Sequence, residues 1–151
     1  MMEFTKAGTA DALVLSSISR RAFESDIAVG ALSKAGPPGY RSVSFYTKMA
    51  RMNHLYKLSA DGLIAGGALL FADGLRLNIG RIFVDPEHFR KGYGIFIMQE
   101  IEKIFPDVEE MSLDTPVWNV RTNTFYQKLG YVRYKEDHEF IYYRKQLSQS
   151  S

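Results

Sequence analysis

The chain has 151 residues, of which 46% are hydrophobic and 24% charged, and its formal net charge is +2. This balance predicts one globular domain over residues 1–147 and a frayed tail at 148–151. The small net charge argues against a general nucleic-acid or membrane binder. The absence of cysteine excludes disulfides, thiolate metal sites and a cysteine nucleophile. We find no signal peptide and no apolar run of membrane-spanning length, so we expect a cytoplasmic protein.

The first third of the chain predicts one strand and two helices. Residues 3–7 favour a short strand, and Thr9 is an N-cap candidate for a helix that fades by Gly30. Residues 34–40 contain two prolines and two glycines, which predicts a loop. A second helix is expected at about 42–53.

Residues 61–62 and 73–74 both have the sequence Asp-Gly, which is a strong signal for a hairpin turn. Two such turns in succession predict a three-stranded meander. The strands are residues 55–60, 63–71 and 75–84. In the third strand the apolar alternation shifts by one residue between positions 79 and 82. A β-bulge near residues 80–81 explains the shift, since one extra residue re-phases a strand. A strand buried on both faces is the alternative.

The second half predicts a helix, a strand, a helix and a final pair of strands. The expected elements are a helix after Gly92 that Pro106 ends, a strand at 111–115, a helix at 119–129 closed by Gly130, and strands at 131–134 and 140–145. Helices separate only some of the strands, which predicts an α/β fold with a mixed sheet. We expect six or seven strands flanked by about four helices.

A short basic turn joins the strand ending at Val84 to the next helix. Its sequence is Val84-Asp-Pro-Glu-His-Phe-Arg-Lys-Gly-Tyr-Gly94. Gly92 and Gly94 leave the backbone bare where the helix begins, so its free N–H groups can face an anion. Arg90 and Lys91 add positive charge there. The combination predicts a phosphate-binding turn, with a solvated surface turn as the alternative for the two cations.

Two motifs together resemble signatures of the GCN5-related N-acetyltransferase (GNAT) superfamily. The first is Val84-x-Pro86-x(5)-Gly92-x-Gly94, which is similar to the family's acetyl-CoA signature. The second is Asn119-Val-Arg-Thr-Asn-Thr-Phe-Tyr126-Gln-Lys-Leu-Gly130-Tyr131, which is similar to Asn-x-x-Ala-x-x-Phe-Tyr-x-x-x-Gly-Phe/Tyr. Their order, separation and predicted elements also match, and the resemblance spans the whole chain.

The resemblance implies a GNAT-like fold and transfer of an acetyl group from acetyl-CoA to a primary amine. It implies that backbone N–H groups of residues 90–94 bind the pyrophosphate and that the backbone of residues 82–84 pairs with the pantetheine arm. The resemblance also implies that Tyr126 is the general acid for the departing thiolate. The alternative is a half-buried tyrosine with a structural role only. Asn119 is a cofactor contact, an N-cap, or both. The implied cofactor-binding residues are Ile82, Phe83, Val84, Phe89, Arg90, Lys91, Gly92, Tyr93, Gly94, Asn119, Phe125 and Tyr126.

Three positions depart from the family pattern. Phe89 stands where the family usually has Gln or Arg, which removes a side-chain donor near the phosphates. Thr122 replaces the usual alanine. Residues 75–84 contain no carboxylate, although relatives often have a glutamate general base on this strand.

The general base and the acceptor site have their own candidates. Asp114, at the end of the strand before the second motif, is the first candidate for the base. A capping role for Asp114 and a water relay without a dedicated base are the alternatives. Glu24 and Asp26 are candidates for contact with a cationic substrate, and Tyr40 and Trp118 for walls of the acceptor pocket. A core position is the alternative for Trp118.

Two functions fit the resemblance: an N-acetyltransferase, and a non-catalytic acyl-CoA-binding sensor or partner module of the same fold. The missing strand carboxylate favours the module, and the motif around Tyr126 favours the enzyme. A nucleotide site is disfavoured because neither a P-loop nor a dinucleotide fingerprint is present. We expect a small-molecule amine rather than a protein as acceptor, no nucleic-acid or membrane partner, and no metal. Family analogy also allows a homodimer.

Overall fold

The computed structural model describes residues 1–147. Within them lie seven strands, four α-helices and three short 3₁₀ helices. In chain order these are β1 (Met2–Lys6), η1 (Thr9–Asp11), α1 (Ala12–Glu24), η2 (Ser25–Val29), α2 (Val43–Arg51), β2 (Leu55–Ala60), β3 (Leu63–Asp73), β4 (Arg76–Val84), η3 (Pro86–His88), α3 (Tyr93–Ile104), β5 (Glu110–Pro116), α4 (Val120–Lys128), β6 (Val132–Glu136) and β7 (Phe140–Gln146). The tail predicted at 148–151 lies outside the described residues.

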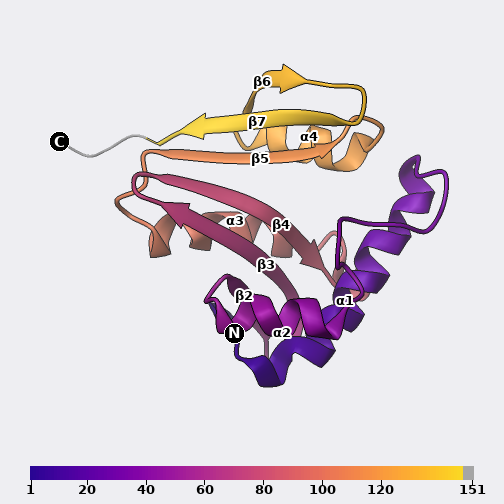
Figure 1. Cartoon of the computed structure of the whole chain (residues 1–151), viewed down its shortest axis with the longest axis vertical. Coiled ribbons are helices and arrows are strands. Elements are labelled where there is room, and N and C mark those ends of the chain that lie inside the picture. Colours follow the sequence, from indigo (N-terminus) through magenta and orange to yellow (C-terminus); the bar gives the residue numbers. More distant parts are fainter. Residues whose placement is uncertain (148–151) are drawn as a thin grey trace.

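The seven strands form one sheet in the order β1-β2-β3-β4-β5-β7-β6 (Figure 1). In the described part of the chain only β4 and β5 are parallel neighbours, and α3 connects them, whereas the other neighbours are antiparallel. Parallel strands need such a crossover connection, so the helix between the two motifs sets this part of the topology. The predicted α/β fold, with a mixed sheet and four helices, is confirmed.

Helices cover both faces of the sheet and enclose two cores. On one face α1 and α2 bury Leu15, Ile18 and Tyr46, each no more than 2% exposed. On the other face α3 and α4 pack through Ile97 and Tyr126, among others. Successive strand residues point to opposite faces, so the same strands contribute to both cores. Figure 1 shows α1 and α2 in front of the sheet and α3 and α4 behind it.

Local hydrogen bonds set the starts of the first two helices. The Ser42 hydroxyl accepts the N–H of Phe45 at 3.1 Å and caps α2, as its position at the start of the predicted helix suggests. The predicted cap at Thr9 is wrong. The Asp11 carboxylate instead accepts the N–H of Gly8 at 2.9 Å, and α1 begins only after the short turn η1.

The predicted bulge is confirmed in β4, where Gly80 is the extra residue. Leu69 of β3 pairs with Arg81, and the next residue of β3 pairs with Ile79. A Cβ at position 80 would lie 2.6 Å from Cε2 of Phe71, which is closer than real Cβ contacts allow. The bulge therefore requires glycine at this point.

β4 and β5 separate after a short paired section. Residues 76–78 of β4 pair with residues 110–112 of β5, and the register ends there. β4 stays paired with β3 as far as Val84, so only its other edge is free. Figure 1 shows the two strands diverging. The divergence leaves the backbone of residues 82–84 available for an extended ligand.

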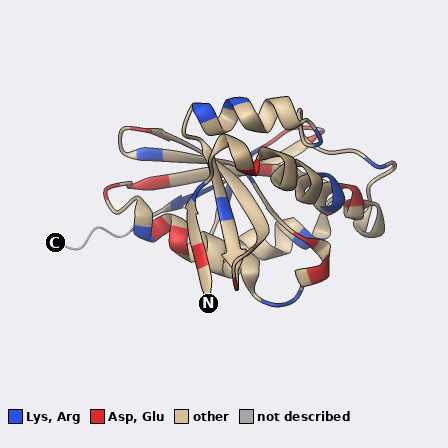
Figure 2. Ribbon diagram, turned by 90° about the horizontal axis from the view of Figure 1, so that it is seen from below, with Lys and Arg blue, Asp and Glu red and all other residues tan. Residues whose placement is uncertain are grey.

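Charged side chains of both signs are spread over the molecule. Figure 2 shows Lys and Arg interspersed with Asp and Glu across the sheet and helices. No helix within residues 1–147 is both long enough and apolar enough to cross a membrane.

Candidate active site

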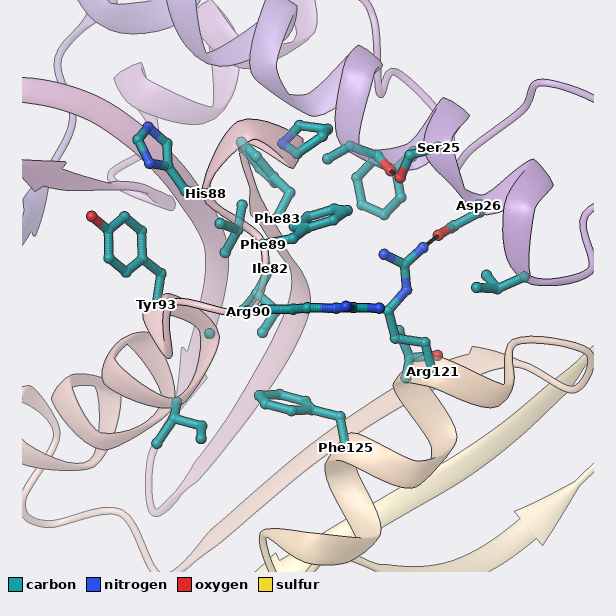
Figure 3. A pocket seen from close by; sticks show the side chains of 18 of the residues that line it. Ser25, Asp26, Ile82, Phe83, His88, Phe89, Arg90, Tyr93, Arg121 and Phe125 are labelled. Carbon is teal, nitrogen blue, oxygen red and sulfur yellow. Dashed lines mark hydrogen bonds and ion pairs between the residues drawn. The ribbon is translucent and has the colours of Figure 1, made fainter.

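A cavity of about 810 Å³ lies beside the free edge of β4. Its walls are η2, the end of β4, the turn that follows, and the first turns of α3 and α4 (Figure 3). Ten of the predicted cofactor-binding residues line it, namely Ile82, Phe83, Val84, Phe89, Arg90, Gly92, Tyr93, Gly94, Phe125 and Tyr126. The other two, Lys91 and Asn119, are not among the lining residues. The Lys91 ammonium instead lies 3.3 Å from Nδ1 of His88.

The glycine turn has the backbone conformation that an anion site needs. Gly92 has a φ of 78° and precedes the first residue of α3, and Arg90 also has a positive φ, of 67°. A positive φ is strained for a residue with a side chain, and such strain gathers at functional sites. The first hydrogen bond of α3 runs from the N–H of Phe96 to the carbonyl of Gly92. The amides of residues 93–95 therefore have no helical acceptor and can bind an anion.

The two glycines serve different purposes. A Cβ at Gly92 would meet nothing within 4 Å, so its left-handed φ, rather than crowding by other protein atoms, requires glycine there. A Cβ at Gly94 would lie 3.3 Å from Cζ of Phe125. Gly94 thus permits the close approach of α3 to α4 as well as leaving room for a ligand.

Tyr126 lines the cavity from α4 and is 7% exposed. Its ring packs against those of Phe125, Tyr131 and Tyr143 at centroid distances of 5.3, 6.0 and 6.3 Å. Within the described residues its hydroxyl has no hydrogen-bond partner. Burial raises the pKa of Tyr126 well above its ordinary value of 10, and the negative charge of Asp114 raises it further. The phenol is therefore protonated at neutral pH and has a proton to donate.

Asp114 lies on β5, close enough to Tyr126 for its charge to affect the phenol. Its side chain remains accessible, while its neighbours in the strand, Leu113 and Thr115, are buried. Partial desolvation raises the pKa of Asp114 above its ordinary value, and the negative charge of Asp137 adds to the rise. Among the described residues the Asp114 carboxylate accepts no hydrogen bond, so the alternative of a capping role is not supported.

Asn119 and Asp26 both make polar contacts with residues of α4 that line the cavity. Asn119 is 2% exposed, and its side-chain oxygen accepts the N–H of Thr122 at 3.1 Å, which caps α4. Asp26 lines the cavity and pairs with Arg121, with Oδ1 and Nη2 3.2 Å apart. Burial raises the pKa of Asp26, although Arg121 and Asn119 oppose the rise. Both predicted roles, a ligand for Asn119 and a substrate contact for Asp26, compete with these internal contacts.

The remaining acceptor candidates lie outside the cavity lining. The Tyr40 hydroxyl donates to Oε2 of Glu24 at 2.8 Å, so the two predicted residues hold each other. Trp118 is 41% exposed, and a Cβ at Gly30 would lie 3.6 Å from its ring and 3.2 Å from its carbonyl oxygen. The alternative of a core position for Trp118 is therefore wrong, because the residue lies at the surface beside the end of η2.

Sequence reasoning missed Arg121 as a residue of the cavity. It stands inside the second motif, two positions after Asn119, in the first turn of α4. A cation in the first turn of the helix that carries the second motif was an available signal. Its partner Asp26 lies 95 residues away in the chain, so the ion pair itself had no local signal.

A protein-family model matches more than half of the chain. Residues 52–133, more than half of the chain, match the acetyltransferase (GNAT) domain family. A search of curated proteins gave no match.

Several solved structures share the fold. The PaiA N-acetyltransferase from Thermoplasma acidophilum, solved in complex with coenzyme A, has a TM-score of 0.84 at 18% identity, covering 97% of this chain and 99% of that one. The ribosomal-protein-S18-alanine N-acetyltransferase from Escherichia coli has a TM-score of 0.78 at 17% identity, covering 100% and 97%. An acetyltransferase from Thermus thermophilus has a TM-score of 0.80 at 12% identity, covering 97% of each chain. Since the matched region contains both the glycine turn and the motif around Tyr126, the chain belongs to the GNAT acetyltransferase family.

Proposed function

We propose that this protein is an N-acetyltransferase that moves the acetyl group of acetyl-CoA directly to a primary amine. The observation that supports this most strongly is a single cavity bordered by three features. They are the free amides of α3, the unpaired edge of β4 and the protonated phenol of Tyr126. Each feature suits a different part of the thioester substrate.

Each part of acetyl-CoA has a group at the cavity wall that would suit it. Its pyrophosphate would bind the N–H groups of residues 93–95, where the helix dipole favours negative charge. Its pantetheine arm contains amides, which would pair with the free backbone of residues 82–84 as an added strand does. Its sulfur would then lie near Tyr126.

The proposed reaction is a direct transfer in a ternary complex. The neutral amine attacks the carbonyl carbon, the C–S bond breaks, and Tyr126 gives its proton to the leaving sulfur. The proton that the amine loses passes to Asp114, either directly or through water. Holding the two substrates in line supplies much of the acceleration without a covalent intermediate. We propose a small-molecule amine as the acceptor rather than a protein.

The test is release of free thiol from acetyl-CoA in the presence of a panel of amines: polyamines, amino acids, an aminoglycoside, and peptides with a free N-terminus or lysine. We expect at least one small amine to raise thiol release well above the amine-free rate, and Tyr126→Phe to remove that increase.

The absence of a carboxylate on β4 favours a second candidate, a non-catalytic module that binds acyl-CoA. Binding of acetyl-CoA by the wild type, with no thiol release for any amine, would support that module instead.

A further inference from the structure

Arg121 extends from the first turn of α4 and lines the cavity. Its Nη2 donates to Oδ1 of Asp26 on η2 at 3.2 Å. Its Cζ lies 4.9 Å from the centroid of the Phe89 ring, on the turn that follows β4. One side chain therefore connects three walls of the cavity (Figure 3).

The guanidinium of Arg121 retains donors that the protein does not use. A guanidinium has five N–H donors. Within the described residues its side chain makes one hydrogen bond, to Asp26. The side chain is 38% exposed and lines the cavity, so the remaining donors are accessible to a ligand. A guanidinium held in place with free donors suits the oxygens of a phosphate.

The charges around the cavity also favour an anion at this point. Asp26 is the only acidic residue that lines the described cavity, whereas Arg90 and Arg121 both contribute positive charge. Arg90 has no ion-pair partner in the described part of the chain, and Figure 3 shows its side chain extending toward Arg121. Two guanidinium groups that line one cavity repel each other, and an anion bound between them would offset that repulsion.

We propose that Arg121 binds the diphosphate of acetyl-CoA together with the glycine turn, and that Asp26 competes with the diphosphate for it. This inference rests on the proposed function. Phe89 has no donor where the family pattern has Gln or Arg, and its ring supports the guanidinium of Arg121 instead. Arg121 thus supplies from α4 the side-chain donor that position 89 lacks.

Calorimetric titration with coenzyme A and with dephospho-coenzyme A tests the assignment, because the second ligand lacks only the 3′-phosphate. We expect Arg121→Ala to weaken both ligands by the same factor, about tenfold to hundredfold, the usual effect of losing a charge-assisted hydrogen bond. We expect Asp26→Asn to tighten both, because it removes the competing carboxylate. Lys128→Ala is the matched control, since Lys128 is an exposed cation at the other end of α4 and does not line the cavity.

Each outcome decides the matter. Wild-type affinity in Arg121→Ala overturns the inference, and a loss for coenzyme A alone moves Arg121 to the 3′-phosphate and overturns the diphosphate assignment. Weaker binding of both ligands in Asp26→Asn would mean that the ion pair with Arg121 holds the guanidinium in its binding position. That result overturns the proposed competition between Asp26 and the diphosphate. If Arg121→Ala does not fold, Arg121→Met keeps an unbranched side chain without charge or N–H donors and should show the same loss. If the wild type binds neither ligand, the proposed function fails. If the wild type binds both ligands and the Arg121 variants bind them equally tightly, only this inference fails.

Discussion

Replacing Tyr126 by phenylalanine removes one buried hydroxyl and leaves the rest of the aromatic cluster in place. The hydroxyl has no hydrogen-bond partner in the described residues, so its loss should change the free energy of unfolding by less than about 1 kcal/mol. A positioned general acid contributes about 10²–10⁴-fold to a rate. We therefore expect kcat to fall by about 100-fold or more, while the Kd for acetyl-CoA stays nearly unchanged.

The assay combines three measurements on the same preparation: thiol release at saturating acetyl-CoA, calorimetric Kd for acetyl-CoA, and the thermal midpoint of unfolding. Tyr131→Phe is the control, because Tyr131 belongs to the same cluster but does not line the cavity. Its kcat should remain close to that of the wild type. Tyr126 is not the general acid if Tyr126→Phe keeps its kcat, or if kcat and affinity for acetyl-CoA fall by the same factor.

Three further predictions concern pH, the glycine turn and stability. Asp114 must be deprotonated to act as a base and its pKa is raised, so Asp114→Asn should lower kcat/KM and remove the acidic limb of its pH profile. Gly92→Ala should cost about 1 kcal/mol of stability through its positive φ and weaken acetyl-CoA binding, both measurable by denaturation and calorimetry. Burial raises the pKa of Asp85, but the bond to Arg21 and the N–H of Glu87 outweigh it and hold that pKa below the ordinary value. The stability that Asp85 contributes is therefore present above its unfolded-state pKa and lost as pH falls through the folded one. Asp85→Asn should cost about 1–2 kcal/mol at neutral pH, because Arg21 is 40% exposed, and flatten the acid dependence of unfolding.

Each of these has a contrary result. An unaltered pH profile in Asp114→Asn would mean that a water relay, rather than Asp114, takes the proton that the amine loses. Full affinity for acetyl-CoA in Gly92→Ala would remove the turn from the cofactor site. An Asp85→Asn protein with the wild-type slope of stability against pH would show that the pair with Arg21 contributes nothing across that range.

The sequence predicts the elements of this fold well because its signals are local. The two Asp-Gly turns and the break in alternation at Gly80 each depend on residues within a few positions of one another. The cavity follows from the same signals, since the two motifs determine where α3 and α4 begin. Most of the predicted cofactor residues line it for that reason.

Contacts between distant segments were not predictable in this way. The pair of Asp26 with Arg121 and the bond of Tyr40 to Glu24 depend on how α1 and the following loop pack. These contacts involve Glu24, Asp26 and Tyr40, which are three of the four residues predicted for the acceptor site. The role of Asn119 was also hard to predict. Its buried side-chain oxygen caps α4, so few of its polar atoms remain free for a ligand.

Calorimetric titration of the wild-type protein with acetyl-CoA, with NADH and ATP as controls, measures whether this cavity is a coenzyme A site. We expect selective micromolar binding of acetyl-CoA, with the glycine turn, the free edge of β4 and the cavity beside Tyr126 as its site. Absence of binding to acetyl-CoA, or equal binding of all three ligands, would contradict the assignment of this cavity to coenzyme A.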